Sequence, residues 1–357
     1  MPRLVSPRLL RRGLEVFAGI SVAGFVGLLL YGNNLPRFLD AMVSLNWGWL
    51  ALGVALASLD WFGGGLRLWV LTRHVHARAR LRHAVLAGGL NTWASLLTPS
   101  QTGGGPMMIY ALKRSGVPLP EAMVSGLMTF VATVAFFAIA GPLAVFFGGG
   151  RSLEQHGVLG GFTLYDLFRV SLGVFVGIGI LMIALFVFPG AIRVLARRLV
   201  AWLESHDSPR LAHRIEDLRA GVDRSHECLV AFFRGRGWGA LFAGVLLSPL
   251  AFANRLVAGY VVLRMLNIEA HFVDVVLLQT VITFLLYFAP TPGGSGLAEV
   301  LSAAVMSIYV PRELTPSYIL LWRILVSYLT VGFGSIVFWR WLKGAEEREE
   351  GPNVASS

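Results

Sequence analysis

Residues 290–299 read PTPGGSGLAE, and residues 98–106 read TPSQTGGGP. Each stretch ends one apolar run and precedes a second, shorter one, at residues 297–310 and 107–112 respectively. As helices these returning runs would rise only about 21 Å and about 9 Å, less than the ~30 Å hydrocarbon core of a bilayer. Glycine and proline allow the chain to turn back between the two runs. Both segments are therefore predicted to be re-entrant hairpins whose tips are buried in protein.

The composition is that of a membrane protein. Of the 357 residues, 55% are hydrophobic and 14% are charged, whereas about a quarter of the residues of a soluble domain are charged. The net charge of +10 therefore predicts attraction to anionic lipid, not to nucleic acid. The single cysteine excludes an intramolecular disulfide, and the eight histidines form no metal-ligand spacing. We expect neither a metal nor a cofactor.

Six windows are long and apolar enough to be full transmembrane helices. They are residues 14–32, 47–71, 121–147, 166–191, 237–264 and 316–341. The predicted fold is thus an all-α polytopic membrane protein with six full transmembrane helices and two re-entrant hairpins.

The arginines and lysines test this topology. With a cytoplasmic N-terminus and both hairpins re-entrant, 22 of these residues lie inside and five outside. If the apolar runs that lead into the hairpins each crossed the membrane completely, 14 of these residues would lie inside and 13 outside. Because positive charge favours the cytoplasmic side of short loops, the first arrangement is preferred. It places both termini in the cytoplasm and the protein in the cytoplasmic (inner) membrane.

This topology implies two repeats related by an offset of about 190 residues. Each repeat consists of a helix, a hairpin and a second helix, and the two hairpins enter from opposite sides of the membrane. Inverted repeats of this kind occur in secondary transporters, which bind their substrate near the midplane. The alternative is that the Gly-Pro clusters only end helices in ordinary loops.

Four regions follow from this organisation. They are a first membrane half at 1–191 with a hairpin near 84–112, a cytoplasmic basic amphipathic linker at 192–236, a second membrane half at 237–343 with a hairpin near 272–310, and a disordered tail at 344–357. The linker is expected to lie on the anionic leaflet; a solvated helical connection is the alternative.

Each hairpin tip begins a half-helix whose first amides have no intrahelical partner, so it favours an anion. Glycines allow the backbone to approach such a ligand closely. The candidate tip residues are Ser100, Gln101, Gly103, Gly104, Gly105, Gly293, Gly294 and Gly296. A different role for the glycines is close helix packing.

Charged residues inside spans are costly and rarely persist without a role. Arg255 and Arg323 are predicted to face the second hairpin and to bind a phosphate. Glu299, in the first turn after Gly296, would hold the arginines in the empty site or take up a proton. Alternatively, this acid only complements the helix dipole.

Three further polar residues lie within the spans. Asn254, beside Arg255, is a candidate substrate ligand, and Asp60 is a candidate for ion coupling. Arg67 lies two helical turns from Asp60, too far for a direct ion pair, and is expected to reach the cytoplasmic interface with its side chain.

The two quoted motifs, together with Trp322-Arg323, resemble the lysylphosphatidylglycerol synthase transmembrane region family over about residues 47–341. This flippase-like domain occurs alone or fused to an aminoacyl-lipid synthase. The resemblance implies movement of a lipid with an anionic or modified head group between leaflets. Its matching motif positions are Gly293, Gly294, Glu299 and Arg323.

Two details qualify the resemblance. Many relatives carry a glutamate and an arginine directly after the first glycines, where this sequence has Pro106, Met107 and Ile109. About 15 residues follow the last span, so we expect the form without the synthase domain.

The leading hypothesis is therefore a translocase that moves an anionic or lipid-linked, phosphate-bearing lipid through a cavity between the repeats. One alternative is a polyprenyl-phosphate-dependent glycosyltransferase, for which the outer loops offer no paired carboxylate motif. The other is an accessory subunit of a lipid-modifying enzyme. The sequence is also compatible with an oligomer.

Overall fold

The computed structural model describes residues 35–144, 227–287 and 289–350, together with short pieces within 15–27 and 146–181 and residue 224. The described chain is helical apart from one two-residue antiparallel pair, β1 (Gly157–Val158) with β2 (Phe162–Thr163), which agrees with the all-α prediction. The predicted spans at 14–32 and 166–191 and most of the linker at 192–236 lie largely outside the described residues.

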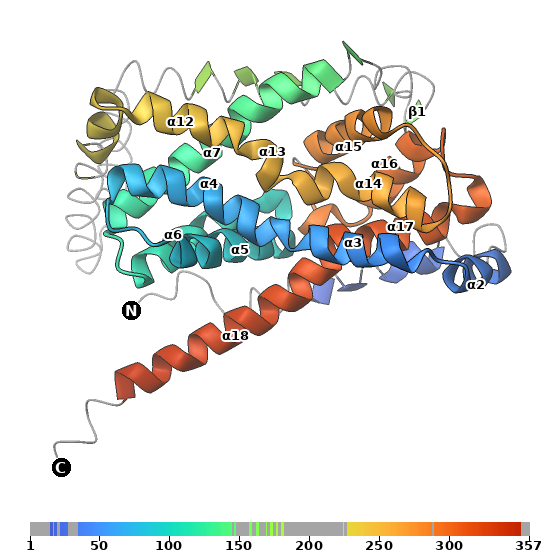
Figure 1. Cartoon of the computed structure of the whole chain (residues 1–357), viewed down its shortest axis with the longest axis horizontal. Coiled ribbons are helices and arrows are strands. Elements are labelled where there is room, and N and C mark those ends of the chain that lie inside the picture. The colour runs from blue at the N-terminus through green and yellow to red at the C-terminus, as the bar shows by residue number, and fades with distance from the viewer. Residues whose placement is uncertain are drawn as a thin grey trace, which may run out of the picture. The chain divides into compact units, whose positions relative to one another are not determined.

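The helices follow one another along the chain as Figure 1 shows. The first half contains α2 (Leu35–Val43), α3 (Trp47–Ala57), α4 (Leu59–Val75), α5 (Leu81–Leu97), η1 (Pro99–Gln101), α6 (Gly104–Arg114) and α7 (Leu119–Ala144). The second half contains α12 (Gly237–Leu246), α13 (Ser248–Ala251), α14 (Ala253–Met265), α15 (Phe272–Leu286), η3 (Pro292–Gly294), α16 (Leu297–Met306), η4 (Arg312–Leu314), α17 (Thr315–Arg323), the π-helix η5 (Ile324–Tyr328) and α18 (Leu329–Glu350).

Three segments of the described chain are long and apolar enough to cross a membrane. They are Trp47–Val75, Leu119–Ala144 and Arg312–Lys343, and they coincide with the predicted spans 47–71, 121–147 and 316–341. A fourth candidate is the pair Glu227–Arg234 and Gly237–Leu246, which is bent by 86°.

The order of elements repeats along the chain. Trp47 begins α3 and Gly237 begins α12, 190 residues later. In both halves a helix, a short 3-10 turn that starts with proline and a second helix then follow, first as α5, η1 and α6 and later as α15, η3 and α16. We call these two groups the first hairpin and the second hairpin. The spacing agrees with the predicted offset.

The predicted span 237–264 is interrupted. It consists of α12, α13 and α14, separated at Leu247 and Phe252. Pro249 has no backbone N–H and therefore cannot continue the hydrogen-bond ladder of the preceding turn. The first half is interrupted at the corresponding place, since Ser58 separates α3 from α4.

The described residues pack into two compact units. We call the first the site unit; it draws on residues 1–60, 89–107 and 253–357. In it α14 packs along both α3 and α15, as Figure 1 shows. The two hairpin tips also meet there, because the Ser100 amide donates to the Ala289 carbonyl over 3.0 Å.

The second unit draws on residues 61–88 and 108–252. Its helices α4 and α5 cross closely, because a Cβ on Gly65 would lie 2.4 Å from the Cα of Val85. Arg67 is 5% exposed and donates to the Ser248 hydroxyl over 3.1 Å. Its guanidinium therefore does not extend to the interface as expected, because a buried partner is available on α13.

The last helix is longer than the sequence suggests. α18 continues to Glu350, beyond residue 344, where the tail is predicted to begin. Glutamate and arginine are good helix formers, which accounts for the extension. Residues 351–357 lie outside the described residues.

Candidate functional site

A buried polar network in the site unit fixes the helix that carries Arg323. Gln279 of α15 donates to the Tyr318 hydroxyl over 3.0 Å and accepts from the Trp322 indole over 3.0 Å. Gly259 of α14 leaves room for this amide, since a Cβ there would lie 2.3 Å from it. We call Gln279, Tyr318 and Trp322 the Gln279 clamp. All three side chains are buried, so their hydrogen bonds are costly to break. They hold α17 against α15.

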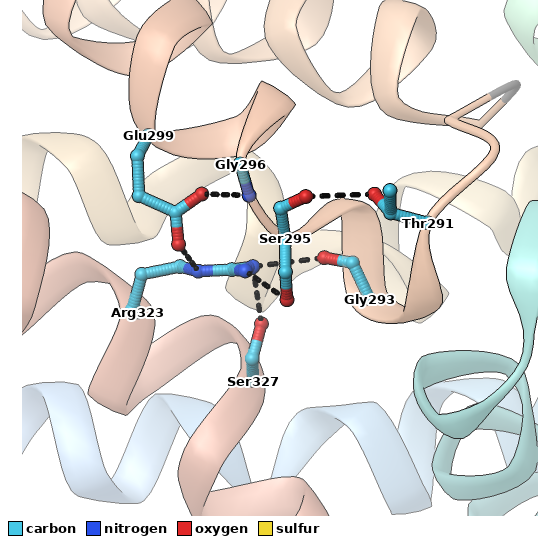
Figure 2. Close-up of polar contacts among 7 residues, drawn as sticks. All are labelled: Thr291, Gly293, Ser295, Gly296, Glu299, Arg323 and Ser327. Atoms are coloured by element: carbon cyan, nitrogen blue, oxygen red, sulfur yellow. Dashed lines mark hydrogen bonds and ion pairs between the residues drawn. The ribbon is translucent and has the colours of Figure 1, made fainter. Parts of the chain in front are cut away.

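The Arg323 guanidinium makes four hydrogen bonds to the second hairpin and its own helix (Figure 2). It donates to the Glu299 carboxylate over 2.9 Å and to the Gly293 carbonyl over 2.9 Å. The Ser295 and Ser327 hydroxyls accept over 3.0 Å and 3.3 Å. With 2% of its side chain exposed, Arg323 is desolvated and rigidly oriented.

Glu299 has two partners, one for each carboxylate oxygen. One oxygen accepts from Arg323, and the other accepts from the Gly296 amide at the start of α16 over 2.7 Å. This acid therefore complements the helix N-terminus and also neutralises the arginine. Both roles considered from the sequence are present in the geometry, and the ion pair links α16 to α17.

The tip of the second hairpin favours glycine. Gly293, Gly294 and Gly296 have φ values of 59°, 67° and 87°, a region that L-residues with side chains rarely adopt. Thr291 closes the turn by donating to the Ser295 carbonyl over 2.8 Å (Figure 2). This turn directs the Gly293 carbonyl toward Arg323.

A pocket of about 40 Å³ lies beside this network. Both hairpin tips contribute to it, through Gln101 from the first and Gly293 and Gly294 from the second, and Arg255 and Arg323 supply positive charge. Such a volume accommodates only a few water-sized groups. The described conformation is therefore nearly closed around the two arginines.

The tip of the first hairpin is built differently. Ser100 and Gln101 have φ values of 49° and 56°, where the second hairpin has glycines. The Gly103 amide donates to the Thr98 hydroxyl over 2.8 Å. A Cβ on Gly104 would lie 2.0 Å from the Ser95 hydroxyl oxygen. Close packing of α6 against α5 thus accounts for Gly104.

Only part of the predicted set lines the pocket. The predicted residues that are not among its lining residues in the described chain are Ser100, Gly103, Gly104, Gly105, Asn254, Gly296 and Glu299. A Cβ on Gly105 would have no neighbour within 4 Å, so packing does not require glycine there.

Asp60 and Asn254 form a separate buried cluster with the last span. The Asp60 carboxylate accepts from the Asn254 amide over 3.0 Å and from the Thr330 hydroxyl over 2.9 Å. Asn254 also donates to the Leu325 carbonyl of η5 over 2.9 Å. The structure thus uses Asn254 to join Asp60 to the π-helix, whereas the sequence suggested a ligand of the substrate. Arg255 lies within electrostatic range of Asp60.

Comparison with known proteins identifies the family of the chain. The chain matches the family described as the lysylphosphatidylglycerol synthase TM region over residues 16–334. The chain belongs to this family. It is also 22% identical over 291 residues to a UPF0104 membrane protein of Archaeoglobus fulgidus, covering 82% of this chain and 86% of the relative.

As a member of the lysylphosphatidylglycerol synthase TM region family, the protein is a multi-pass membrane protein. The matched region contains both hairpins and every residue that lines the pocket. Of the motif positions noted in the sequence, Arg323, Glu299, Gly293 and Gly294 lie together at the second tip.

Several partners of Arg323 were not recognised from the sequence. Ser295 lies inside the PTPGGSGLAE motif, and Ser327 lies four residues after Arg323, one helical turn away. Both positions could have been considered from spacing alone. The Gln279 clamp had no comparable signal, because its members are 39 and 43 residues apart.

Proposed function

We propose that this protein is a lipid translocase and not an enzyme. Its substrate is an anionic or lipid-linked lipid whose phosphate binds at the Arg323 pocket while the acyl or polyprenyl chains stay in the bilayer. We further propose that the hairpins are re-entrant and oppositely oriented, that six helices span the cytoplasmic membrane, and that both termini are cytoplasmic.

One observation carries the proposal: two arginines and a glycine-rich tip line one small pocket in the site unit. A guanidinium presents donors in a planar fork that matches phosphate oxygens. Arg323 is already oriented by Glu299 and Ser295, so little side-chain ordering opposes binding. Charged groups placed inside spans in this way are typical of substrate pathways.

Glu299 and the lipid phosphate would alternate as the partner of Arg323 during transport. In the described conformation it neutralises Arg323, so the positive charge is not left uncompensated when the substrate is absent. A lipid phosphate would compete with Glu299 for the guanidinium. The displaced carboxylate would then take up a proton or retain only the Gly296 amide, which couples substrate binding to the state of this acid.

The pocket must open during such a cycle. At about 40 Å³ it is too small for a lipid head group, so we expect the second tip to separate from α17. The contacts to be broken are those that Arg323 makes with Gly293 and Ser295.

Reconstitution into liposomes tests the proposal. Fluorescent anionic lipids and a lipid-linked sugar are placed in both leaflets, and movement is followed by quenching of the outer leaflet. The unmodified protein should move at least one of them. Arg323→Ala and Arg255→Ala should each slow this movement about tenfold or more, because each removes a charge-assisted hydrogen bond to phosphate.

Arg312→Ala is the matched control, since Arg312 is an exposed arginine of η4 and its loss should leave the rate unchanged. Size-exclusion profiles exclude misfolding as the cause of a slow rate. The proposal fails if the unmodified protein moves none of the lipids, or if both pocket variants move them at the full rate. Formation of a sugar-transfer product by the purified chain would instead support the glycosyltransferase alternative.

A further inference from the structure

A second pocket lies in the second unit, where α4 ends and α5 begins. It is lined by Thr72 from the last turn of α4, by His76, Arg78 and Arg80 from the connecting loop, by His83 from α5 and by Leu112 from α6. The loop is held in place because the Trp69 indole donates to the Ala79 carbonyl over 3.1 Å. The pocket measures about 20 Å³, which fits one oxygen of a small anion and excludes a sugar or ring.

The charge around this second pocket is positive. Arg78 and Arg80 are exposed at its rim, and Arg80 immediately precedes α5, whose N-terminal end carries partial positive charge. Glu121 contacts the pocket residue His76, and its carboxylate is already bound to the His76 ring over 2.7 Å. An anion would therefore meet guanidinium groups and a helix N-terminus, while the Glu121 carboxylate is already occupied by His76.

Thr72 provides an independent indication of a ligand. It is 0% exposed, it lines the pocket, and its hydroxyl has no hydrogen-bond partner within the described chain. A buried hydroxyl without a partner is unfavourable. A ligand oxygen in the pocket would satisfy this group.

The position of the pocket indicates where the ligand comes from. Trp47–Val75 is one of the candidate spans, and the pocket begins at its last turn. Trp69 lies in that last part of the span with the Arg73 guanidinium 5.1 Å from its ring centroid, a pairing suited to the membrane–water boundary. Lipid phosphates occupy this level, and Leu81 at the start of α5 is 44% exposed.

We infer that this second pocket binds the phosphate of an anionic lipid head group at the membrane interface, with Thr72, Arg78 and Arg80 as its donors. A phosphate monoester, as in phosphatidate, fits best because no head-group alcohol is attached to it and its terminal oxygens carry more charge than those of a diester. The binding does not depend on transport through the Arg323 pocket.

The pKa of His83, measured by NMR, should report whether phosphate is bound in this pocket. Burial, and then the charges of Arg82 and Arg80, lowers the pKa of His83 below its ordinary value. A bound phosphate favours the imidazolium and should raise this pKa. The other titratable groups at the pocket, His76 and Glu121, form their own pair.

The experiment titrates the full-length protein in neutral detergent with dioctanoyl phosphatidate, dioctanoyl phosphatidylcholine and inorganic phosphate. Phosphatidate should bind, while phosphatidylcholine and inorganic phosphate should bind at least about tenfold more weakly. Arg78→Ala/Arg80→Ala and Thr72→Val should each weaken phosphatidate binding about tenfold. NMR titration should show the His83 pKa rising with phosphatidate.

Thr72→Val separates a binding role from a structural one. Without lipid this variant should unfold at the same temperature as the unmodified protein or a higher one, because it removes a hydroxyl without a partner. The inference is overturned if Thr72→Val lowers the unfolding temperature and leaves affinity unchanged, if phosphatidylcholine binds as tightly as phosphatidate, or if inorganic phosphate binds equally well. None of these readings uses transport, so the translocase proposal can fail independently.

Discussion

At the scale of single residues, Asp60 shows how an acid is retained inside a span. It is 2% exposed, and its carboxylate accepts hydrogen bonds from two other helices, through Asn254 of α14 and Thr330 of α18. If the acid were removed, Thr330 would lose its acceptor and Asn254 would lose one of its two acceptors. Asp60 therefore joins α4 to α14 and α18 through the interior of the site unit.

Asp60→Leu should lower the free energy of unfolding by about 2–4 kcal/mol, since it leaves the Thr330 hydroxyl and one Asn254 amide hydrogen without an acceptor. Asp60→Asn keeps an acceptor and should cost about 1 kcal/mol. Unfolding in detergent by heat or denaturant measures both changes. Equal stability of the leucine variant and the unmodified protein would contradict this account.

The charged residues of the site could be recognised from the sequence more readily than the neutral residues that contact them. Glu299 and Arg323 are noticeable in sequence because charge inside a span is costly, and the structure joins them. The role of Asn254 could not be predicted from the sequence, because its amide donates to Asp60, 194 residues away, and to the backbone carbonyl of Leu325. Such partners become neighbours only when the chain has folded.

At the scale of elements, the two hairpins use glycine for different purposes. In the second hairpin the glycines have positive φ and shape the turn around Arg323. In the first, Gly104 allows α6 to approach α5, because a side chain there would overlap Ser95 and the Asn91 carbonyl. At Gly105, the next residue, an added Cβ would have no neighbour within 4 Å.

Gly104→Ala should destabilise the protein by about 1–3 kcal/mol, because the added methyl forces α5 and α6 apart. Gly105→Ala is the matched control and should be neutral or stabilising by up to about 1 kcal/mol, since alanine favours the helix. Thermal unfolding of the two purified variants checks the difference. A stable Gly104→Ala protein would show that the close approach of these helices is not needed.

Helix positions could be predicted more readily than helix interruptions. Apolar length predicted Leu119–Ala144 and Arg312–Lys343 closely, because the bilayer requires such lengths. The interruptions at Ser58 and Leu247 lie within strongly apolar windows, where average hydropathy hides them. At the second of these, Ser248-Pro249 was a local signal for the end of a helix.

At the scale of the whole molecule, the site unit is assembled from three separate parts of the chain. The second unit likewise combines residues 61–88 with residues 108–252. The first hairpin contributes to both units, since α5 and α6 each extend across the division. Its direction of entry into the membrane is therefore the most informative test of the proposed topology.

Cysteine labelling tests that direction. In a Cys228→Ser background, Arg114→Cys should react with an impermeant maleimide only after the cells are opened, because Arg114 at the end of α6 is proposed to be cytoplasmic. Arg312→Cys, in the exposed η4, should react in intact cells. Reaction of position 114 in intact cells would mean that the first hairpin crosses the membrane.

The π-helix η5 sets the rotational phase of the last span. Residues seven apart on a regular helix point in nearly the same direction, and Arg323 and Thr330 are seven apart. One residue inserted into a turn, as in a π-helix, rotates everything that follows by about 100°. Because η5 lies between them, Arg323 can face the second hairpin while Thr330 faces Asp60. Conversion of η5 to a regular α-helix would bring these two side chains back into phase, so that the span could not satisfy both at once.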